Sequence, residues 1–135
     1  MLTEWLNDEL LSPEKKLSGE WYLFEYYTER GDELVHVEEK DIQKEKIFMT
    51  INFGDSGELK WTSNINLSVL ELETENLTWE RKRNFLFISE EHQSEEKIHF
   101  QYAVEKDILK LLSKTETGKI NFFGFFKRPE PTKNN

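Results

Sequence analysis

The sequence predicts an all-β domain, an up-and-down antiparallel β-barrel of eight to ten strands preceded by a short N-terminal helix. From Gly19 onward apolar residues recur with a period of two, as in a strand with one buried face. Turn residues return about every eight to twelve positions, which is typical of all-β domains. No helix long enough for a crossover separates the expected strands, so hairpins join neighbours and closure removes exposed edges. A β-sandwich is the alternative.

Composition limits the classes of partner. The 135 residues suffice for one domain, and aromatic residues make up 13% of them, so a few large side chains drive folding. Acidic residues outnumber basic ones 27 to 18, which excludes nucleic acid and anionic membranes as expected partners and favours solubility. Without cysteine there is no disulfide, thiol nucleophile or thiolate metal site.

The first 18 residues predict a helical lead-in that packs on the barrel. Thr3 can cap a helix over residues 3–11, and Ser12-Pro13 starts a further turn that ends near Leu17. This amphipathic segment either closes one end of the barrel or binds a membrane or partner. The N-terminus has no basic region and no long apolar run, so we expect a cytoplasmic protein if Met1 is the native start.

The barrel is expected over residues 19–128. Its first strand runs from Gly19 to about Glu29, turns at residues 30–32 and returns in a short strand over 34–37. The charged stretch 38–45 reads as a solvated loop or strand rim. Residues 47–53 alternate clearly, and the turn at 54–57 leads into a strand that carries Leu59 and Trp61.

Six further strands complete the expected barrel. They cover residues 65–72, 77–82, 85–88, 98–104, 108–112 and 120–128. The segment 90–96 is a polar connection, and turns precede residues 85, 108 and 120. Residues 129–135 contain two prolines and predict a disordered tail.

At three places the chain resembles the bacterial lipocalin-like families of the calycin superfamily. These are Gly19-Glu20-Trp21 at the first strand, the hairpin over residues 51–59, and the last strand, Phe122-Phe123-Gly124-Phe125-Phe126-Lys127-Arg128. The resemblance spans residues 17–128. It implies that Trp21 lies at the closed end of the barrel and that Arg128, or Lys127, packs across it as a cation–π partner. Gly19, Trp21 and Arg128 would thus close the barrel, a structural role without an implied activity.

Fatty-acid-binding proteins, which are similar in length and strand count, insert a two-helix lid between their first two strands. Only about three residues are available for that connection here. This departure removes the lid and, with it, the transfer of that family's arginine–tyrosine carboxylate site.

The aromatic side chains of the strands are the best candidates for a functional site. A small apolar or amphipathic ligand inside the barrel would contact inward side chains. The expected ligand-binding residues are Trp61, Trp79, Arg81, Phe87, Phe100 and Tyr102. Arg81 shares a face with Trp79 and is placed to meet a ligand carboxylate. The competing interpretation is an interior filled by these side chains, with Arg81 at the rim.

A second interpretation is a protein–protein interaction module. Tyr22, Phe24 and Tyr26 are expected on one face of the first strand, opposite Trp21, Leu23 and Tyr27, so one aromatic set must point outward. Phe123 and Phe125 lie on the last strand, which we expect beside the first, and one of the two faces of that strand must likewise point its aromatics outward. Together these outward aromatics predict a homodimer or partner interface. Cover by the N-terminal helix, through Trp5 and Leu6, is the alternative.

No pattern indicates an enzyme. The chain has no nucleophile elbow, phosphate loop or dinucleotide fingerprint, and no cofactor is expected. His36, His92 and His99 lack metal-ligand spacing, so no metal site is expected. An isomerase that uses one buried acid is the third hypothesis, after ligand binding and self-association.

Overall fold

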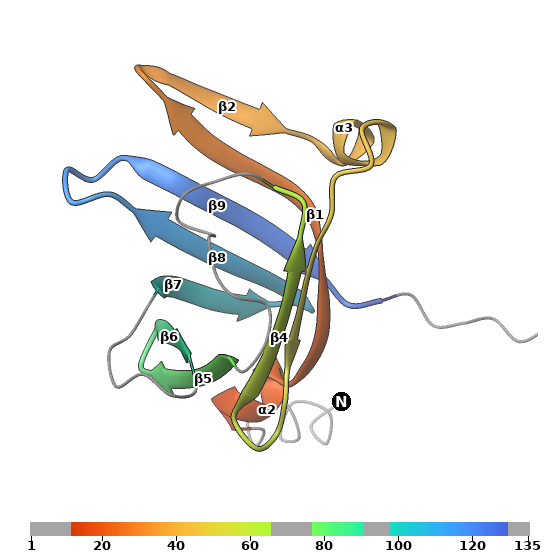
Figure 1. Cartoon of the computed structure of the whole chain (residues 1–135), viewed down its shortest axis with the longest axis vertical. Coiled ribbons are helices and arrows are strands. Elements are labelled where there is room, and N and C mark those ends of the chain that lie inside the picture. The colour runs from red at the N-terminus through yellow and green to blue at the C-terminus, as the bar shows by residue number, and fades with distance from the viewer. Residues whose placement is uncertain (1–11, 66–76, 91–97, 130–135) are drawn as a thin grey trace, which may run out of the picture.

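A computed structural model describes residues 12–65, 77–90 and 98–129. The helix expected at residues 3–11, nearly all of the strand expected at 65–72, most of the connection at 90–96 and nearly all of the tail lie outside these ranges. Within them the chain forms a closed antiparallel barrel with a short helix before its first strand (Figure 1). The predicted fold class is therefore confirmed.

Eight strands close the barrel, because β1 pairs with both β3 and β9. Every pairing is antiparallel, and from β3 onward each strand pairs with the next in sequence, which gives the up-and-down order. The eight strands are β1 (Gly19–Arg30), β3 (Met49–Phe53), β4 (Glu58–Ser63), β5 (Leu77–Lys82), β6 (Phe85–Glu90), β7 (Ile98–Glu105), β8 (Ile108–Lys114) and β9 (Ile120–Lys127). The predicted strands agree with these bounds to within about three residues.

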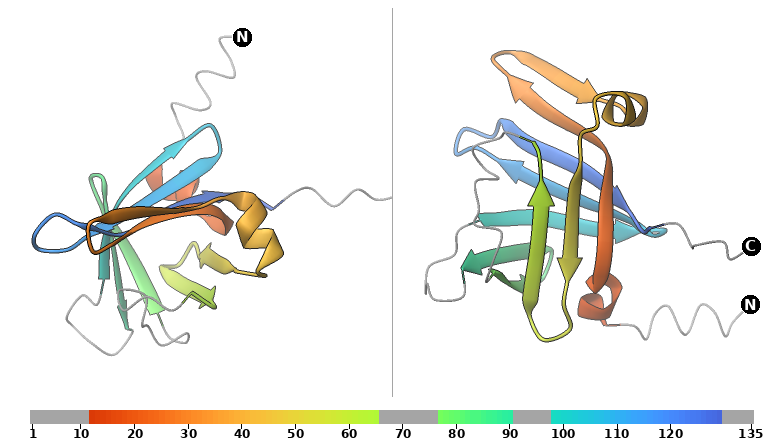
Figure 2. Two further views of the ribbon diagram at one scale, coloured as in Figure 1. Left: turned by 90° about the horizontal axis from the view of Figure 1, so that it is seen from above. Right: turned by 45° about the vertical axis from the view of Figure 1, so that its right-hand side comes forward.

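A ninth strand, β2 (Glu33–Val37), lies outside the closed ring. It pairs only with the C-terminal half of β1, whereas β3 pairs with the N-terminal half on the same edge. The β1–β2 hairpin therefore extends beyond the barrel at the end away from α2 (Pro13–Leu17), as Figures 1 and 2 show.

A bulge in β1 changes which aromatics point inward. The register of β1 against β9 shifts between Leu23 and Glu25, so the alternation restarts one residue later. Trp21 and Leu23 are buried before the bulge, and Tyr26 is buried after it, while Tyr27 faces outward. The expectation that Tyr27 shares a face with Trp21, opposite Tyr26, is wrong, because strict alternation does not survive a bulge.

The charged stretch expected to be a loop or strand rim contains a helix instead, α3 (Glu39–Lys44). Its first turn is held by amide hydrogen bonds to the Glu38 carbonyl, and the Asp41 carboxylate accepts a bond from the Glu38 amide at 3.4 Å. Ile42 is buried against the core. This one apolar residue anchors a helix that the charge pattern concealed.

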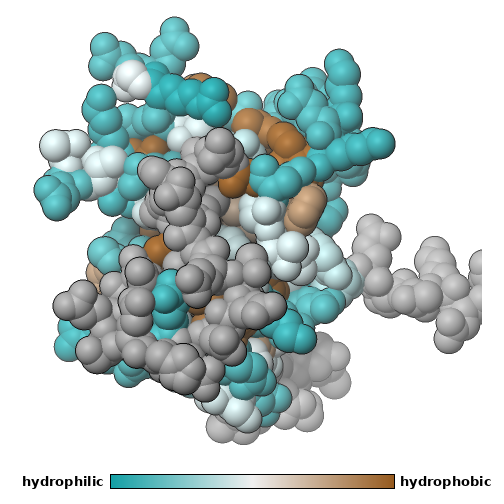
Figure 3. Space-filling model, viewed as in Figure 1, coloured by the Kyte–Doolittle hydropathy of each residue, from teal (hydrophilic) through white to brown (hydrophobic). Residues whose placement is uncertain are grey.

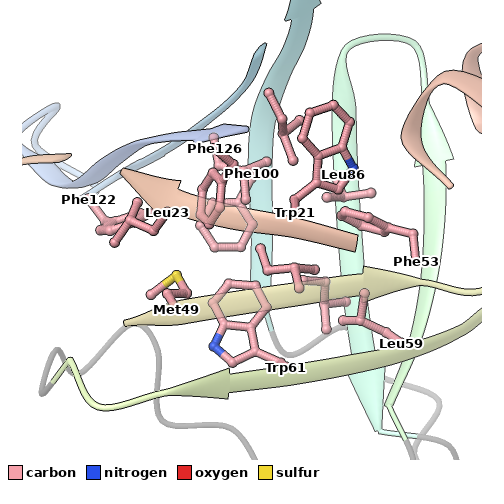
Figure 4. Close-up of a cluster of buried hydrophobic side chains, with 14 of the residues drawn as sticks. Trp21, Leu23, Met49, Phe53, Leu59, Trp61, Leu86, Phe100, Phe122 and Phe126 are labelled. Atoms are coloured by element: carbon pink, nitrogen blue, oxygen red, sulfur yellow. The ribbon is translucent and has the colours of Figure 1, made fainter. Parts of the chain in front are cut away.

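Buried side chains from all eight strands form one core inside the barrel (Figure 4). Trp21, Phe53, Phe100, Phe122 and Phe126 are its largest fully buried side chains. Gly124 lies among them because a side chain there would collide with the Phe122 ring. The glycine thus leaves room for two neighbouring phenylalanines of β9 to pack inward.

Candidate functional site

The barrel end beside α2 is closed by a small set of directed contacts. The Trp21 indole N–H donates to the Leu17 carbonyl at 2.8 Å, and the Arg128 guanidinium lies 3.8 Å from the centre of the Trp21 ring. Arg128 also donates to the Ser18 carbonyl at 2.7 Å and the Lys16 carbonyl at 3.0 Å. These bonds join the last strand to the unsatisfied carbonyls at the end of α2.

Gly19 and Arg128 fit together at this end. Gly19 has a φ of 97°, and a Cβ atom there would stand 3.0 Å from an Arg128 nitrogen. Burial lowers the pKa of the Arg128 guanidinium, although an arginine stays protonated at any physiological pH. Lys127, the other candidate for this role, instead lies over the Phe24 ring and pairs with Glu39 at 2.7 Å.

Arg81 lies on the inward-facing side of β5, but its guanidinium is already engaged. Its Nε donates to Glu14 of α2 at 3.0 Å, and another nitrogen donates to the Arg83 carbonyl at 2.6 Å. The bond to Glu14 raises the pKa of Arg81. The pKa of the Glu14 carboxyl is lowered, first by its own backbone amide and then by Arg81. A ligand carboxylate would have to displace Glu14 to reach this arginine.

Trp79 and Tyr102 are half-buried on inward-facing positions near the same end. The Trp79 indole N–H donates to the Gly54 carbonyl at 3.0 Å, and its ring packs edge-on against Phe53 at 5.2 Å between centroids. Tyr102 packs against the core and contributes to the raised pKa of Arg81 through a hydrogen bond. The polar groups of Trp79 and Arg81 thus serve to hold the barrel together.

Trp61 and Phe100 form the centre of the interior. They come from β4 and β7, on opposite walls, and their rings stack at 6.0 Å with an interplanar angle of 15°. Phe100 is fully buried and Trp61 is 3% exposed. In Figure 4 the Trp61 indole nitrogen points toward the side on which Met49 lies, away from Leu59.

The Trp61 indole N–H has no hydrogen-bond acceptor within the described part of the chain, and the nitrogen is buried. Trp21 and Trp79 both donate to backbone carbonyls, so Trp61 is the exception among the described tryptophans. A buried donor left without an acceptor costs about 1–3 kcal/mol. Trp61 therefore offers an unused donor inside the barrel.

The wall beside Trp61 is only partly paired. β4 pairs with β5 at two positions, Glu58 with Thr78 and Leu59 with Leu77, so the rest of β4 has no partner on that edge among the described strands. Hydrophobic surface is visible between β2 and α3 in Figure 3. Val37, at the end of β2, and Ile47, after α3, are partly buried against the core. Among the described strands, the end of the barrel away from α2 is thus less fully paired, and its surface is in part apolar.

Phe87 is the one expected ligand-binding residue on the outward side. Its neighbours Leu86 and Ile88 are fully buried, so Phe87 points away from the interior. It packs with Phe85 and His99, and the Lys82 ammonium lies 5.6 Å from its ring centre. The structure therefore brings Trp61 and Phe100 together at the centre, places Trp79, Arg81 and Tyr102 toward α2, and separates Phe87 from them.

One feature of the site escapes sequence reasoning. Glu14, the partner of Arg81, lies 67 positions away in the chain, and no local pattern connects the two. Met49, by contrast, follows the alternation predicted over residues 47–53, and it is buried on the same face as Ile51 and Phe53.

In the described ranges no three histidine or acidic side chains gather in a way that could hold a metal ion. No described helix has the length and apolar character needed to cross a membrane. Comparison with protein-family models, curated proteins and solved structures gives no match.

Proposed function

We propose that this barrel binds a small, largely apolar ligand beside the Trp61–Phe100 stack and that the Trp61 indole N–H donates a hydrogen bond to it. The observation that carries the proposal is the buried, unused Trp61 donor. An apolar body would pack on the two stacked rings, and one oxygen acceptor would pair the indole. The proposed ligand is therefore an apolar molecule that carries one hydrogen-bond acceptor.

The surroundings favour a neutral ligand. Arg81 is paired with Glu14 in an exposed contact at the α2 end, so this guanidinium is not available to a ligand beside Trp61. Trp79, Arg81 and Phe87, three of the residues that the sequence predicts to bind a ligand, do not contact the ligand in this proposal.

Two probes of matched size test the proposal. The first is 2-nonanone, which carries one carbonyl acceptor, and the second is nonane, which carries none. Trp61→Phe keeps an aromatic ring but removes the N–H, and Trp79→Phe is its control because it removes an N–H that already has an acceptor. We expect the ketone to shift the Trp61 indole signal in ¹H–¹⁵N NMR spectra. Trp61→Phe should weaken ketone binding about tenfold without changing nonane binding.

Native mass spectrometry of the protein purified from its own host supplies the second readout. The expected result is a retained small molecule that Trp61→Phe loses and Trp79→Phe keeps. If the host-purified protein carries nothing and neither probe moves an interior signal, the interior is packed shut and the proposal is wrong.

A further inference from the structure

On the outside of the barrel, side chains of β1, β9 and β8 lie side by side in two cross-strand rows. Tyr27, Phe123 and Leu112 form one row, and the next consists of Glu25, Phe125 and Lys110. We call these six side chains the β1–β9–β8 face. All six are half-buried, and they point outward because Phe122, Gly124, Leu109 and Leu111 point inward.

The rings of this face form one contact network. Phe123 and Phe125 are 4.7 Å apart between centroids, and Tyr27 lies 6.2 Å from Phe123 and 6.0 Å from Phe125. Phe24, at the bulge, lies 6.5 Å from Phe125. Outward aromatics this closely grouped are typical of the centre of a protein interface.

The charges on the face complement one another across Phe125. Glu25 lies on one side of it, paired with His36 at 2.6 Å, and Lys110 lies on the other, paired with Glu105 at 3.5 Å. If a second copy stacks on this face about a two-fold axis along β9, Phe125 meets Phe125. Glu25 of each copy then faces Lys110 of the other, so the same ion pair forms twice.

The other row obeys the same symmetry. Phe123 would meet its own counterpart, and Tyr27 would meet Leu112 of the second copy. Both rows therefore match themselves under one axis, apolar against apolar and acid against base. This self-match favours a second copy over an unrelated partner, even though each chain has a net charge of -9.

We propose that two copies of this chain associate through the β1–β9–β8 face about a two-fold axis along β9. Sedimentation velocity over a range of concentrations should show a monomer–dimer equilibrium. Phe125→Lys should abolish the dimer. Phe87→Lys is the matched control, because it places the same charge on a half-buried outward aromatic of β6 and should leave the equilibrium unchanged.

A charge exchange tests the axis itself. Glu25→Lys and Lys110→Glu should each weaken the homodimer about tenfold or more, because each opposes like charges twice. An equimolar mixture of the two variants restores both ion pairs, so it should form a heterodimer of about wild-type strength, identified by native mass spectrometry. Loss of the contacts within each chain cannot produce this rescue.

Three results would overturn the proposal: a wild-type monomer at every concentration, no rescue in the mixture, or a dimer that appears only when residues 1–11 are removed. The last result would mean that the N-terminal segment covers this face.

Discussion

Replacing Arg128 by alanine should destabilise the barrel by about 3 kcal/mol. Two short hydrogen bonds from a charged donor, at 2.7 and 3.0 Å, contribute about 1.5 kcal/mol each, and the contact with Trp21 adds about 1 kcal/mol. A third bond, to the Glu20 carbonyl at 3.3 Å, adds little. The sum is reduced because water can reach the half-buried guanidinium and the contributions share one side chain.

Urea unfolding, followed by tryptophan fluorescence and circular dichroism, measures this loss. The melting temperature should fall by about 10 °C. Arg128→Lys keeps the charge but loses the planar fork, so it should cost about half as much. Arg30→Ala removes the same charge from an exposed position and should change stability by less than about 0.5 kcal/mol. A loss below about 1 kcal/mol for Arg128→Ala would show that these contacts do not hold the barrel closed.

Three further predictions concern the stability of the folded barrel. Gly124→Ala should cost about 2 kcal/mol in urea unfolding, because the added methyl falls on a fully buried phenylalanine ring. Thr28→Val should cost about 1–2 kcal/mol, because the buried hydroxyl donates to the Asn121 carbonyl at 2.8 Å and the variant leaves that carbonyl unpaired. The pKa of the Glu14 carboxyl is lower in the folded chain than in the unfolded chain. The ionised carboxylate therefore adds to the free energy of unfolding above its unfolded-state pKa, and this gain is lost as the pH falls through its folded-state pKa. Glu14→Gln should therefore make stability less dependent on pH below about pH 4.

Thr28→Val has a matched control, and for each of the other two variants one result would contradict the prediction. Thr62→Val, on an exposed position of β4, should be neutral where Thr28→Val is not. A stable Gly124→Ala variant would mean that the two inward phenylalanines of β9 can move apart. If Glu14→Gln leaves the pH dependence of stability at acid pH unchanged, the contact between Glu14 and Arg81 does not survive in solution.

The strand pattern was predictable because one face of nearly every strand is buried. Alternation over residues 47–53, 98–104 and 120–128 corresponds to β3, β7 and β9, whose inward residues pack in one core. Two local errors have physical causes. The bulge in β1 adds one residue, so Tyr26 points inward and Tyr27 outward, the opposite of the prediction. The helix α3 was missed because its single buried residue, Ile42, lies among charged residues in the sequence.

The site was harder to predict than the fold, because a side chain's polar partner is set by tertiary contacts. Trp61, Trp79 and Trp21 look alike in the sequence, because each follows a polar residue on a predicted strand. Only the three-dimensional arrangement shows which indoles find carbonyls. The partner of Trp21 comes from α2, and that of Trp79 comes from the β3–β4 turn.

The tryptophans also divide the barrel into two ends with different character. At the α2 end, Trp21 and Trp79 donate to backbone carbonyls, while Arg128 and Arg81 tie β9 and β5 to α2. Gly19-Glu20-Trp21, one of the three segments on which the sequence resemblance rests, lies at this end, where Trp21 contacts both α2 and Arg128. Binding is therefore to be sought where these contacts stop: inside the barrel at Trp61, where a donor is unused, and outside it on the β1–β9–β8 face, where the same strand presents its other side.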